Sequence, residues 1–367
     1  MTSKKMDYTL FIVTMILVAF GLLMVFNSSY YYAIEMGEDK MFFFNSELKW
    51  SIVGLVAMFI ASVFNYKNYK PLAIPMFAVN IALLVWVLLK GVTRNHAQRW
   101  IAIGTQSFQP VEFTKIAVIL LVAFLLEKNY QKINQPKILG IYLAIAGSNA
   151  YFIMKQPNMS SAMIIVGIVA IMLFVAGLRW LYVFSVGTLG SALAFFFVKS
   201  ADYRYERWVA FLHPFEAKGD TAWQIIQSLY ALGTGGLFGV GLGMSTQNKL
   251  YIPQPQNDFI LATVGEEFGF VGTVILLALF LILIYRCIKI AINAPDPFSM
   301  FVASGITGML SLQIVMNYAV ATSSMPVTGV SLPFISYGGT SIMTLMGCIG
   351  IMLNISKYCG ERTSKGD

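Results

Sequence analysis

Charged side chains are scarce in this sequence. Only 11% of its 367 residues are Asp, Glu, Lys or Arg, whereas 57% are hydrophobic, and soluble globular proteins carry roughly 25% charged residues. Cysteine and histidine are also rare: Cys287, Cys348 and Cys359 form no CxxC pair, and His96 and His213 lie far apart. The composition therefore excludes an ordinary soluble domain and argues against a structural metal site or an external disulfide.

The chain also lacks a fixed-period repeat, a low-complexity tail and a separate soluble segment. We therefore predict a single membrane domain over residues 1–367, with no nucleic acid among its partners. The glycine-rich stretch GTGGLFGVGLG (233–243) is not followed by GKS or GKT, which argues against a nucleotide-binding P-loop. We expect these glycines to serve tight turns and close approach between backbone segments.

Continuous apolar runs make up most of the chain. A helix that crosses a bilayer needs roughly 17–25 residues, and ten runs come close to this length: 9–27, 48–64, 71–89, 111–126, 138–154, 159–177, 181–198, 259–285, 299–321 and 340–355. Helices are required because lipid offers the backbone no hydrogen-bond partner, and the alternation of a β-barrel is absent. We predict an all-α polytopic membrane protein with about ten transmembrane helices.

The distribution of Lys and Arg predicts the orientation of these helices. With both termini cytoplasmic, the cytoplasmic segments hold more than half of the basic residues and fewer than a third of the acidic ones, in agreement with the positive-inside rule. The first run follows only eight residues and lacks a small-residue cleavage site, so we expect it to be a retained span.

This orientation predicts a large extracytoplasmic loop, residues 199–257, between the seventh and eighth spans. Long loops in compact proteins usually have a function. The stretch TAWQIIQSLYAL (221–232) places Trp223, Ile226, Leu229 and Tyr230 at helical spacing. It therefore predicts an amphipathic helix at the membrane interface.

Several basic residues fall outside or near the outer membrane surface, against the positive-inside trend: Arg94, Arg99, Lys115, Lys155, Arg204, Arg207 and Lys249. Lys115 follows Glu112 by three residues at the start of an apolar helix, and ionisable groups at membrane depth are functional candidates. Cations at this level suit an anionic lipid that carries a phosphate or pyrophosphate. Simple solvation is the alternative for any single exposed cation.

Three acids lie close together in YIPQPQNDFILATVGEEFGFVG (251–272). Asp258 precedes the eighth apolar run at the outer lip of the membrane, where a carboxylate is accessible to water and close to lipid headgroups, as a general base requires. Glu266 lies about two helical turns deeper. We interpret Glu266 and Glu267 as structural residues that pair with buried cations and brace the bundle.

Six stretches carry a resemblance to a known family: RWIAIGTQSFQPVEFTK (99–115), YRYERWVAFLHPF (203–215), WQIIQSLYALGTGGLFGVGLGMS (223–245), YIPQPQNDFI (251–260), GEEFGFVG (265–272) and MPVTGVSLPFISYGGTS (325–341). Through them the chain resembles the SEDS family (shape, elongation, division and sporulation), the FtsW/RodA/SpoVE-type membrane glycosyltransferases of bacterial wall synthesis. The resemblance extends over nearly the whole chain.

The resemblance implies polymerisation of lipid II at the outer face of the bacterial cytoplasmic (inner) membrane, with Asp258 matching the family's essential aspartate. Asp258 would accept the proton of a sugar hydroxyl that attacks the donor glycan, and undecaprenyl pyrophosphate would leave. No tightly bound cofactor is implied, although a divalent cation, Mg²⁺ or Mn²⁺, can accompany the pyrophosphate. The implied partners are a class B penicillin-binding protein, which is a transpeptidase, and membrane lipids.

The matching stretches also supply the residues that we expect to bind the lipid-linked substrate: Arg99, Glu112, Lys115, Arg207, Lys249, Ser336, Gly338 and Gly339. The two glycines would let the backbone approach the substrate. The alternative for them is an ordinary turn before the last span.

The sequence departs from the family pattern at a few positions. Residues 157–160 read PNMS where the family commonly has PDLG, and Val111, Gln254 and Asn257 replace the usual serine, acid and threonine. We expect the acid missing at Asn158 to be structural. Three functions stay open: a glycosyltransferase acting in elongation, division or sporulation, a transporter that flips lipid II, and a scaffold with weakened catalysis.

Overall fold

The computed structural model describes residues 5–94, 97–104, 106–185, 187–188, 202–216, 219–249 and 251–359. In these residues, seven helices are long and apolar enough to cross a membrane: α1 (Tyr8–Glu35), α2 (Phe42–Val63), α3 (Tyr69–Lys90, preceded by the 3-10 turn Tyr66–Asn68), α5 (Pro136–Lys155), α10 (Ile260–Ile292), α11 (Pro297–Ala321) and α12 (Gly339–Ser356). The more charged α4 (Pro110–Asn129) and the shorter apolar α6 (Met159–Val175) pack among them. The predicted seventh span, 181–198, lies largely outside the described residues, so the number of ten spans stays a prediction.

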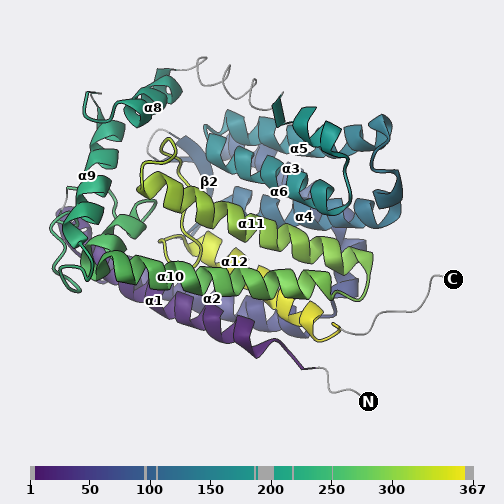
Figure 1. Cartoon of the computed structure of the whole chain (residues 1–367), viewed down its shortest axis with the longest axis horizontal. Helices are drawn as coiled ribbons and strands as arrows, with labels where there is room; N and C mark the ends of the chain where they lie inside the picture. The colour runs from purple at the N-terminus through teal and green to yellow at the C-terminus, as the bar shows by residue number, and fades with distance from the viewer. Residues whose placement is uncertain are drawn as a thin grey trace.

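The helices run side by side along one direction and form a bundle (Figure 1). In the most apolar stretch of α11 and of α12, 78% of the residues are buried. The corresponding share is 22% in α10 and in the helix that contains α3, so α11 and α12 form the centre of the bundle. The outer helices expose apolar side chains such as Phe59, Leu89 and Phe270. Such side chains are stable in contact with lipid, because they lose nothing by facing hydrocarbon.

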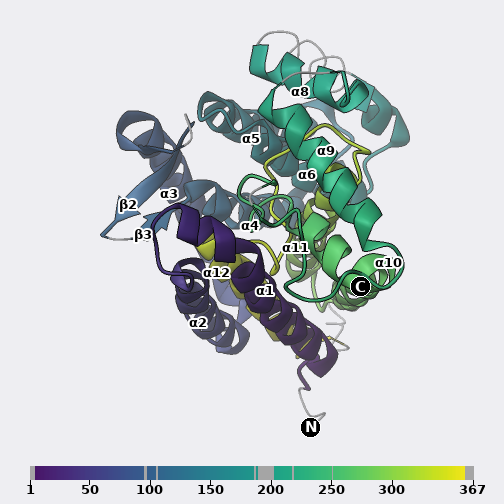
Figure 2. The ribbon, with the colours of Figure 1, turned by 90° about the vertical axis from the view of Figure 1, so that its left-hand side faces the viewer.

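The beginning of α1 and the end of α12 meet at one end of the bundle. The backbone N–H of Asp7 donates to Ser356 Oγ at 3.1 Å, and Arg286 Nη2 pairs with Asp7 Oδ2 at 2.5 Å. Helices α8 (Asp202–Leu212) and α9 (Asp220–Gly235) lie at the opposite end (Figures 1 and 2). The described part of the predicted 199–257 loop is thus separated by the length of the bundle from Asp7 and Ser356.

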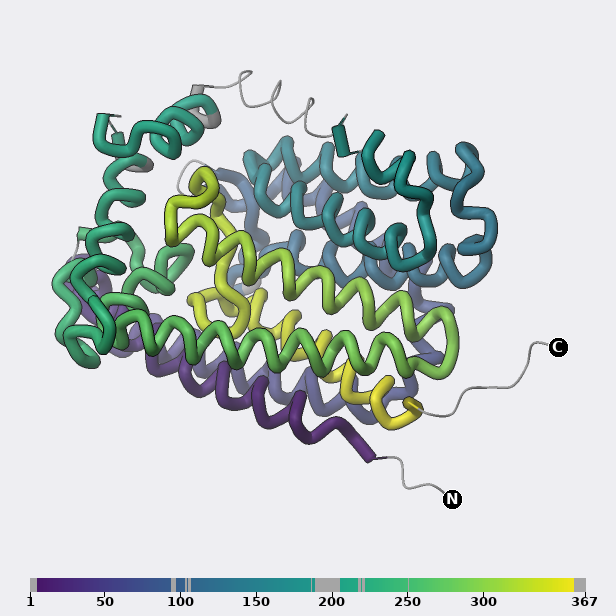
Figure 3. Tube along the Cα trace, viewed as in Figure 1, coloured from purple at the N-terminus to yellow at the C-terminus, as the bar shows by residue number. Residues whose placement is uncertain are grey.

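Helix α9 confirms the predicted helix in the long loop. One side of it buries Ala222, Ile225 and Ala231, while Trp223 and Tyr230 on the other side are exposed. The helix packs against α10. The chain trace follows it toward the end of α1 and the start of α10 (Figure 3). It therefore places the glycine-rich stretch next to the start of α10.

The connection between α3 and α4 contains a small antiparallel sheet, which the all-α prediction missed. Its strands are β1 (Val92–Arg94), β2 (Ala97–Ile103) and β3 (Gln106–Phe108), in the order β1-β2-β3. Gly104, with a φ of 61°, turns the chain after β2, in a conformation that glycine adopts without strain. The sheet holds Arg99, on β2, toward the end of the bundle that carries α8 and α9 (Figure 1).

Helix α10 is interrupted at Gly269, whose φ of 67° and ψ of −165° are not helical. Residues 236–241 lie against this break and supply the missing backbone partners. Four hydrogen bonds join the two segments: Val240 N–H to Glu266 O (2.9 Å), Gly241 N–H to Glu267 O (3.0 Å), Phe270 N–H to Gly236 O (2.9 Å) and Val271 N–H to Leu237 O (3.0 Å). A Cβ at Gly239 would collide with the carbonyl oxygen of Glu267, so the predicted close backbone approach is confirmed.

Candidate functional site

Asp258 lies just before α10, at the end of the bundle that carries α8 and α9. Its backbone is held from α11, because Asn317 Nδ2 donates to the carbonyl oxygens of Asp258 at 2.8 Å and of Val330 at 2.9 Å. Two residues earlier, the carbonyl of Gln256 accepts a hydrogen bond from Tyr337 N–H at 2.8 Å. The chain around Asp258 is thus fixed by contacts with the segments before α12.

The Asp258 carboxyl is partly exposed yet surrounded by protein. Burial raises its pKa from 3.8 to about 6, although the positive charges of Arg207 and Arg99 oppose the rise. A carboxylate with this pKa is largely ionised at neutral pH and is more basic than an aspartate in water. These are the properties of a general base.

The two arginines whose charges act on Asp258 belong to different elements. Arg207 extends from α8 and donates from Nη1 to the carbonyl of Val327 at 3.3 Å. Arg99 extends from β2, donates from Nε to the carbonyl of Gln156 at 3.2 Å, and also donates to the carbonyl of Pro157. The structure therefore brings together Asp258, Arg99 and Arg207, three of the residues selected from the sequence.

The PNMS stretch lies beside Arg99, because Pro157 is one of the residues that accept its hydrogen bonds. Asn158 is the N-cap of α6, and its Oδ1 accepts a hydrogen bond from Ser161 N–H at 3.2 Å. Asparagine caps helices as well as aspartate does. Asn158 therefore has a structural contact in this chain, and the structural role of an acid at this position stays a prediction.

Lys115 and Glu112 form a buried ion pair within α4. Lys115 Nζ lies 2.8 Å from Glu112 Oε1, and the two side chains are 2% and 7% exposed. Breaking such a pair leaves one uncompensated charge in a low-dielectric environment. The predicted association of the two residues is present, and each side chain faces the other instead of solvent.

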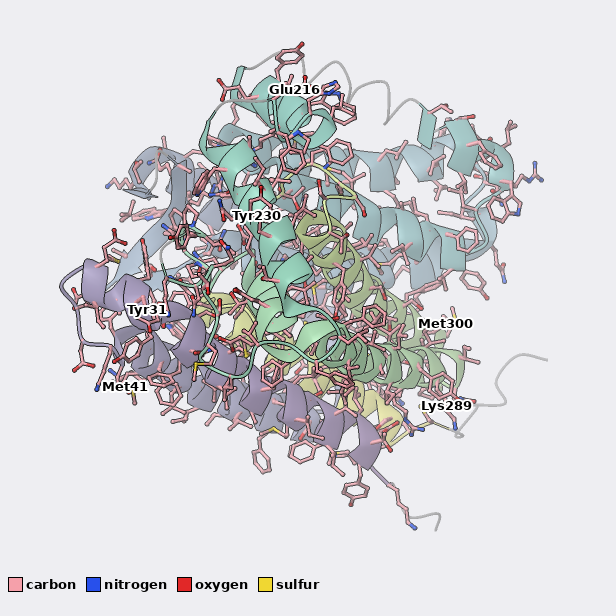
Figure 4. The ribbon with its side chains drawn as sticks, turned by 60° about the vertical axis from the view of Figure 1, so that its left-hand side comes forward. Tyr31, Met41, Glu216, Tyr230, Lys289 and Met300 are labelled. Carbon is pink, nitrogen blue, oxygen red and sulfur yellow. The ribbon has the colours of Figure 1, made fainter. Side chains whose placement is uncertain are left out.

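Lys249 is exposed, and its ammonium group lies 6.0 Å from the centre of the Tyr31 ring. Figure 4 places Tyr31 and Tyr230 toward the end with α9, away from Lys289 and Met300. Lys249 thus lies near the end of the bundle that carries α9, and its position outside the membrane stays a prediction.

Gly338 and Gly339 contact α2, whereas Ser336 bonds within its own segment. The Ser336 hydroxyl is buried and accepts a hydrogen bond from Leu332 N–H at 2.8 Å. A Cβ at Gly339 would collide with the indole ring of Trp50. These contacts pack the turn before α12, and the binding of substrate by Ser336, Gly338 and Gly339 stays a prediction.

The acids of α10 brace the structure, but their described partners are neutral donors and not the cations that we predicted. Glu266 accepts hydrogen bonds from the hydroxyl of Ser245, from Thr246 N–H at 2.9 Å and from Gln247 N–H at 3.2 Å. Glu267 accepts a hydrogen bond from the side-chain amide of Asn27. In the described part of the chain, the two carboxylates tie residues 245–247 and α1 to α10.

Glu47 is a buried acid that sequence reasoning missed. It lies in α2, is 2% exposed, and accepts a hydrogen bond from Gly338 N–H at Oε2, at 3.1 Å. The signal was present in FFFNSELKW (42–50), where one acid precedes an apolar run. Glu47 lies one residue before the apolar run 48–64, so its position in the sequence did not indicate burial.

Within the described residues, no group of three or more His, Cys, Asp or Glu side chains is arranged to hold a metal ion. The positive charge near Asp258 comes from the guanidinium groups of Arg99 and Arg207. Guanidinium groups suit the planar, bidentate recognition of phosphate oxygens.

Comparison with known proteins gives consistent matches over nearly the whole chain. A family model described as cell cycle protein, FtsW/RodA/SpoVE, matches residues 7–361. Stage V sporulation protein E of Bacillus subtilis (strain 168) is 40% identical over 363 residues, covering 98% of this chain and 99% of that protein. The probable peptidoglycan glycosyltransferase FtsW of Trichlorobacter lovleyi is 36% identical over 353 residues, covering 95% of this chain and 93% of that protein.

Two solved structures share the fold. A chain in a structure titled "Structural coordination of polymerization and crosslinking by a peptidoglycan synthase complex" has a TM-score of 0.80 and 26% identity, covering 97% of this chain and 98% of that chain. The crystal structure of the rod shape determining protein RodA of Thermus thermophilus has a TM-score of 0.72 and 25% identity, with the same coverage of 97% and 98%.

Proposed function

The chain belongs to the FtsW, RodA and SpoVE family of cell cycle proteins, and from this membership we propose that it is a peptidoglycan glycosyltransferase that polymerises lipid II into glycan strands during bacterial cell-wall synthesis. The observation that carries the proposal is the position of Asp258, a carboxylate of raised pKa beside Arg99 and Arg207 at the outer end of the bundle. The names of the relatives support it, because several are called probable peptidoglycan glycosyltransferases.

In this reaction a sugar hydroxyl of the acceptor attacks the anomeric carbon of the donor. A new glycosidic C–O bond forms, the bond from that carbon to the pyrophosphate oxygen breaks, and undecaprenyl pyrophosphate leaves with the bonding electrons. Asp258 takes the hydroxyl proton, which makes the oxygen a better nucleophile. Arg99 and Arg207 stabilise the negative charge that develops on the departing pyrophosphate.

We assign supporting parts to the other selected residues. Lys249, exposed at the outer surface, attracts the anionic headgroup. The Lys115–Glu112 pair maintains the wall of the site from within α4. A divalent cation, Mg²⁺ or Mn²⁺, would arrive with the pyrophosphate itself, so the proposed reaction needs no tightly bound cofactor.

We place the protein in the bacterial cytoplasmic membrane with both termini in the cytoplasm. Support comes from the distribution of Lys and Arg. The arrangement of Asp7 beside Ser356, at the end opposite α8 and α9, is consistent with termini on one side and the site on the other.

We propose a class B penicillin-binding protein as the partner that crosslinks the strands. The solved chain of highest TM-score among those cited comes from a structure whose title describes a peptidoglycan synthase complex that couples polymerisation and crosslinking. Lipid II, undecaprenyl pyrophosphate and the surrounding membrane lipids are the other expected partners.

The test is polymerisation of lipid II by the full-length protein purified with its transpeptidase. The wild-type complex should form glycan strands, and Asp258→Asn should reduce the rate by about 10²-fold or more, because asparagine cannot accept the proton. Glu127→Gln is a matched control, since Glu127 pairs with Lys70 at the opposite end of the bundle.

The outcomes separate the three functions. Full activity of Asp258→Asn would remove the general-base assignment. An inert wild-type complex that moves lipid II across vesicle membranes would favour the transporter, and an inert complex that neither polymerises nor transports would favour the scaffold.

A further inference from the structure

One side of α2 forms a platform beneath the turn that precedes α12. Ser46 and Glu47 lie three and four residues after Phe43, and Trp50 lies four and three residues after them, so the four side chains project from one side of the helix. All four touch the segment 337–339. The name α2 platform is used below for these four residues.

The contacts of the α2 platform are of several kinds. The ring of Phe43 packs edge-to-face on Tyr337, with centroids 5.2 Å apart, and the hydroxyls of Ser46 and Tyr337 lie 3.2 Å apart. The indole ring of Trp50 fills the space where Gly339 has no side chain. Together these contacts fix both the side chain of Tyr337 and the backbone that follows it.

Glu47 is the acidic member of the α2 platform, and its carboxyl group contacts the start of another helix. Gly338 is the N-cap of α12 and has no side chain with which to cap it. Glu47 Oε2 accepts the N–H of Gly338 at 3.1 Å, so a carboxylate from α2 lies at the positive end of α12.

The same turn also holds the segment that leads to Asp258. Two consecutive N–H groups of the turn bond to different segments. Tyr337 N–H donates to the carbonyl of Gln256 at 2.8 Å, and Gly338 N–H donates to Glu47. Gln256 is 1% exposed and lies two residues before Asp258. A shift of the turn would therefore move Gln256, and with it the reactive carboxylate.

We propose that Glu47 is a positioning residue for glycosyl transfer, acting through Gly338, Tyr337 and Gln256 to hold Asp258 in place. The inference rests on the proposed function, because it assigns to Glu47 a part in orienting the proposed base. The proposed role of Glu47 requires a hydrogen-bond acceptor at the position of Oε2. A variant with an uncharged acceptor at this position should therefore keep the activity. A variant of the same shape without an acceptor should lose it.

The experiment compares Glu47→Gln with Glu47→Met in the purified complex with lipid II. Glu47→Met keeps the side-chain length but removes the acceptor, and a misplaced catalytic group reduces turnover strongly, so kcat should fall about tenfold or more with KM little changed. Glu47→Gln should stay within about threefold of wild type in kcat, because its amide oxygen accepts the same bond. Glu127→Met is the matched control, and its activity should equal that of wild type.

Amide hydrogen exchange gives a second measurement that does not depend on turnover. In Glu47→Met, exchange should rise in peptides that contain Tyr337, Gly338 and Gln256 and stay unchanged in the inner half of α10. In Glu47→Gln it should match wild type. A general loss of stability would instead raise exchange throughout the bundle.

Two results would overturn the inference while leaving the proposed function intact. The first is a kcat and an amide exchange in Glu47→Met that equal those of wild type. The second is a fall in kcat of about tenfold or more in Glu47→Gln, which would mean that the charge and not the hydrogen bond matters. If Glu47→Met does not accumulate, the Glu47→Gln comparison decides alone. Failure of the proposed function is distinguishable, because the wild-type complex would then form no glycan strands.

Discussion

The raised pKa of Asp258 makes a quantitative prediction about pH. Burial raises this pKa from 3.8 to about 6. A general base works only in its ionised form, and with a pKa of about 6 the carboxyl is about nine-tenths ionised at pH 7 and about one-tenth ionised at pH 5. The rate of polymerisation should therefore fall about tenfold between these pH values, whereas an aspartate with an unshifted pKa would change by less than about a tenth.

The neighbouring arginines supply an internal control for this pH profile. The charges of Arg207 and Arg99 lower the pKa of Asp258 against the effect of burial. Arg207→Gln removes one of these charges, so the acid limb of the profile should move to higher pH, while Arg207→Lys keeps the charge and should move it less. An acid limb that stayed in place in both variants would not belong to Asp258.

The same shift has a consequence for stability. Because the folded pKa lies above the unfolded one, the neutral carboxyl is favoured in the folded state, and this contribution disappears as the pH rises through about 6. The rise from 3.8 to about 6 corresponds to at most about 3 kcal/mol. Asp258→Asn should therefore unfold at a higher temperature than wild type at pH 7.5, while losing activity.

The assay is the initial rate of strand formation by the purified complex from about pH 5 to about pH 8, at saturating lipid II. Thermal unfolding of wild type and Asp258→Asn is measured over the same range. A rate that does not change across this range, or an acid limb that stays in place in Arg207→Gln, would refute the assignment of Asp258 as a base of raised pKa.

Two further predictions concern the bundle. Lys115→Met leaves Glu112 charged and unpaired in a buried site, which should cost about 3–5 kcal/mol, and Glu112→Gln combined with Lys115→Met should recover most of it; thermal unfolding in detergent measures both, and equal stability of the single and double variants would contradict a paired structural role. Gly239→Ala should lower the unfolding temperature by several degrees, since its φ is 79° and a Cβ would collide with the Glu267 carbonyl oxygen. Gly233→Ala, where a Cβ meets nothing within 4 Å, should be neutral, so identical losses in the two alanine variants would be the contrary result.

Much of the bundle follows from the sequence because lipid allows the backbone few solutions. The apolar runs predict helices wherever the structure describes them, and the spacing of Trp223 and Tyr230 predicts α9. Asp258 and its arginines could be selected because charges near an apolar run are rare. These features depend on local composition, which a sequence displays directly.

The features that sequence reasoning missed depend on contacts between distant segments. Glu47 and Gly338 are 291 residues apart, so nothing near Glu47 in the sequence indicates its partner. The break at Gly269 looks like one more glycine in an apolar run until residues 236–241 are placed beside it. The strands of the sheet before α4 are short, with β1 and β3 of three residues each, which is too few for an alternating pattern to stand out.

The hydrogen bonds that close the break in α10 also bear on how the protein is made. In a lipid environment, each backbone group without a partner costs several kcal/mol, and the groups of Glu266, Glu267, Phe270 and Val271 find theirs in residues 236–241. Those residues precede α10 in the chain, so they emerge from the ribosome first and are present when the helix forms. We therefore expect insertion of α10 to be coupled to docking of residues 236–241, because a chain that inserts the helix without docking this segment retains an unsatisfied break.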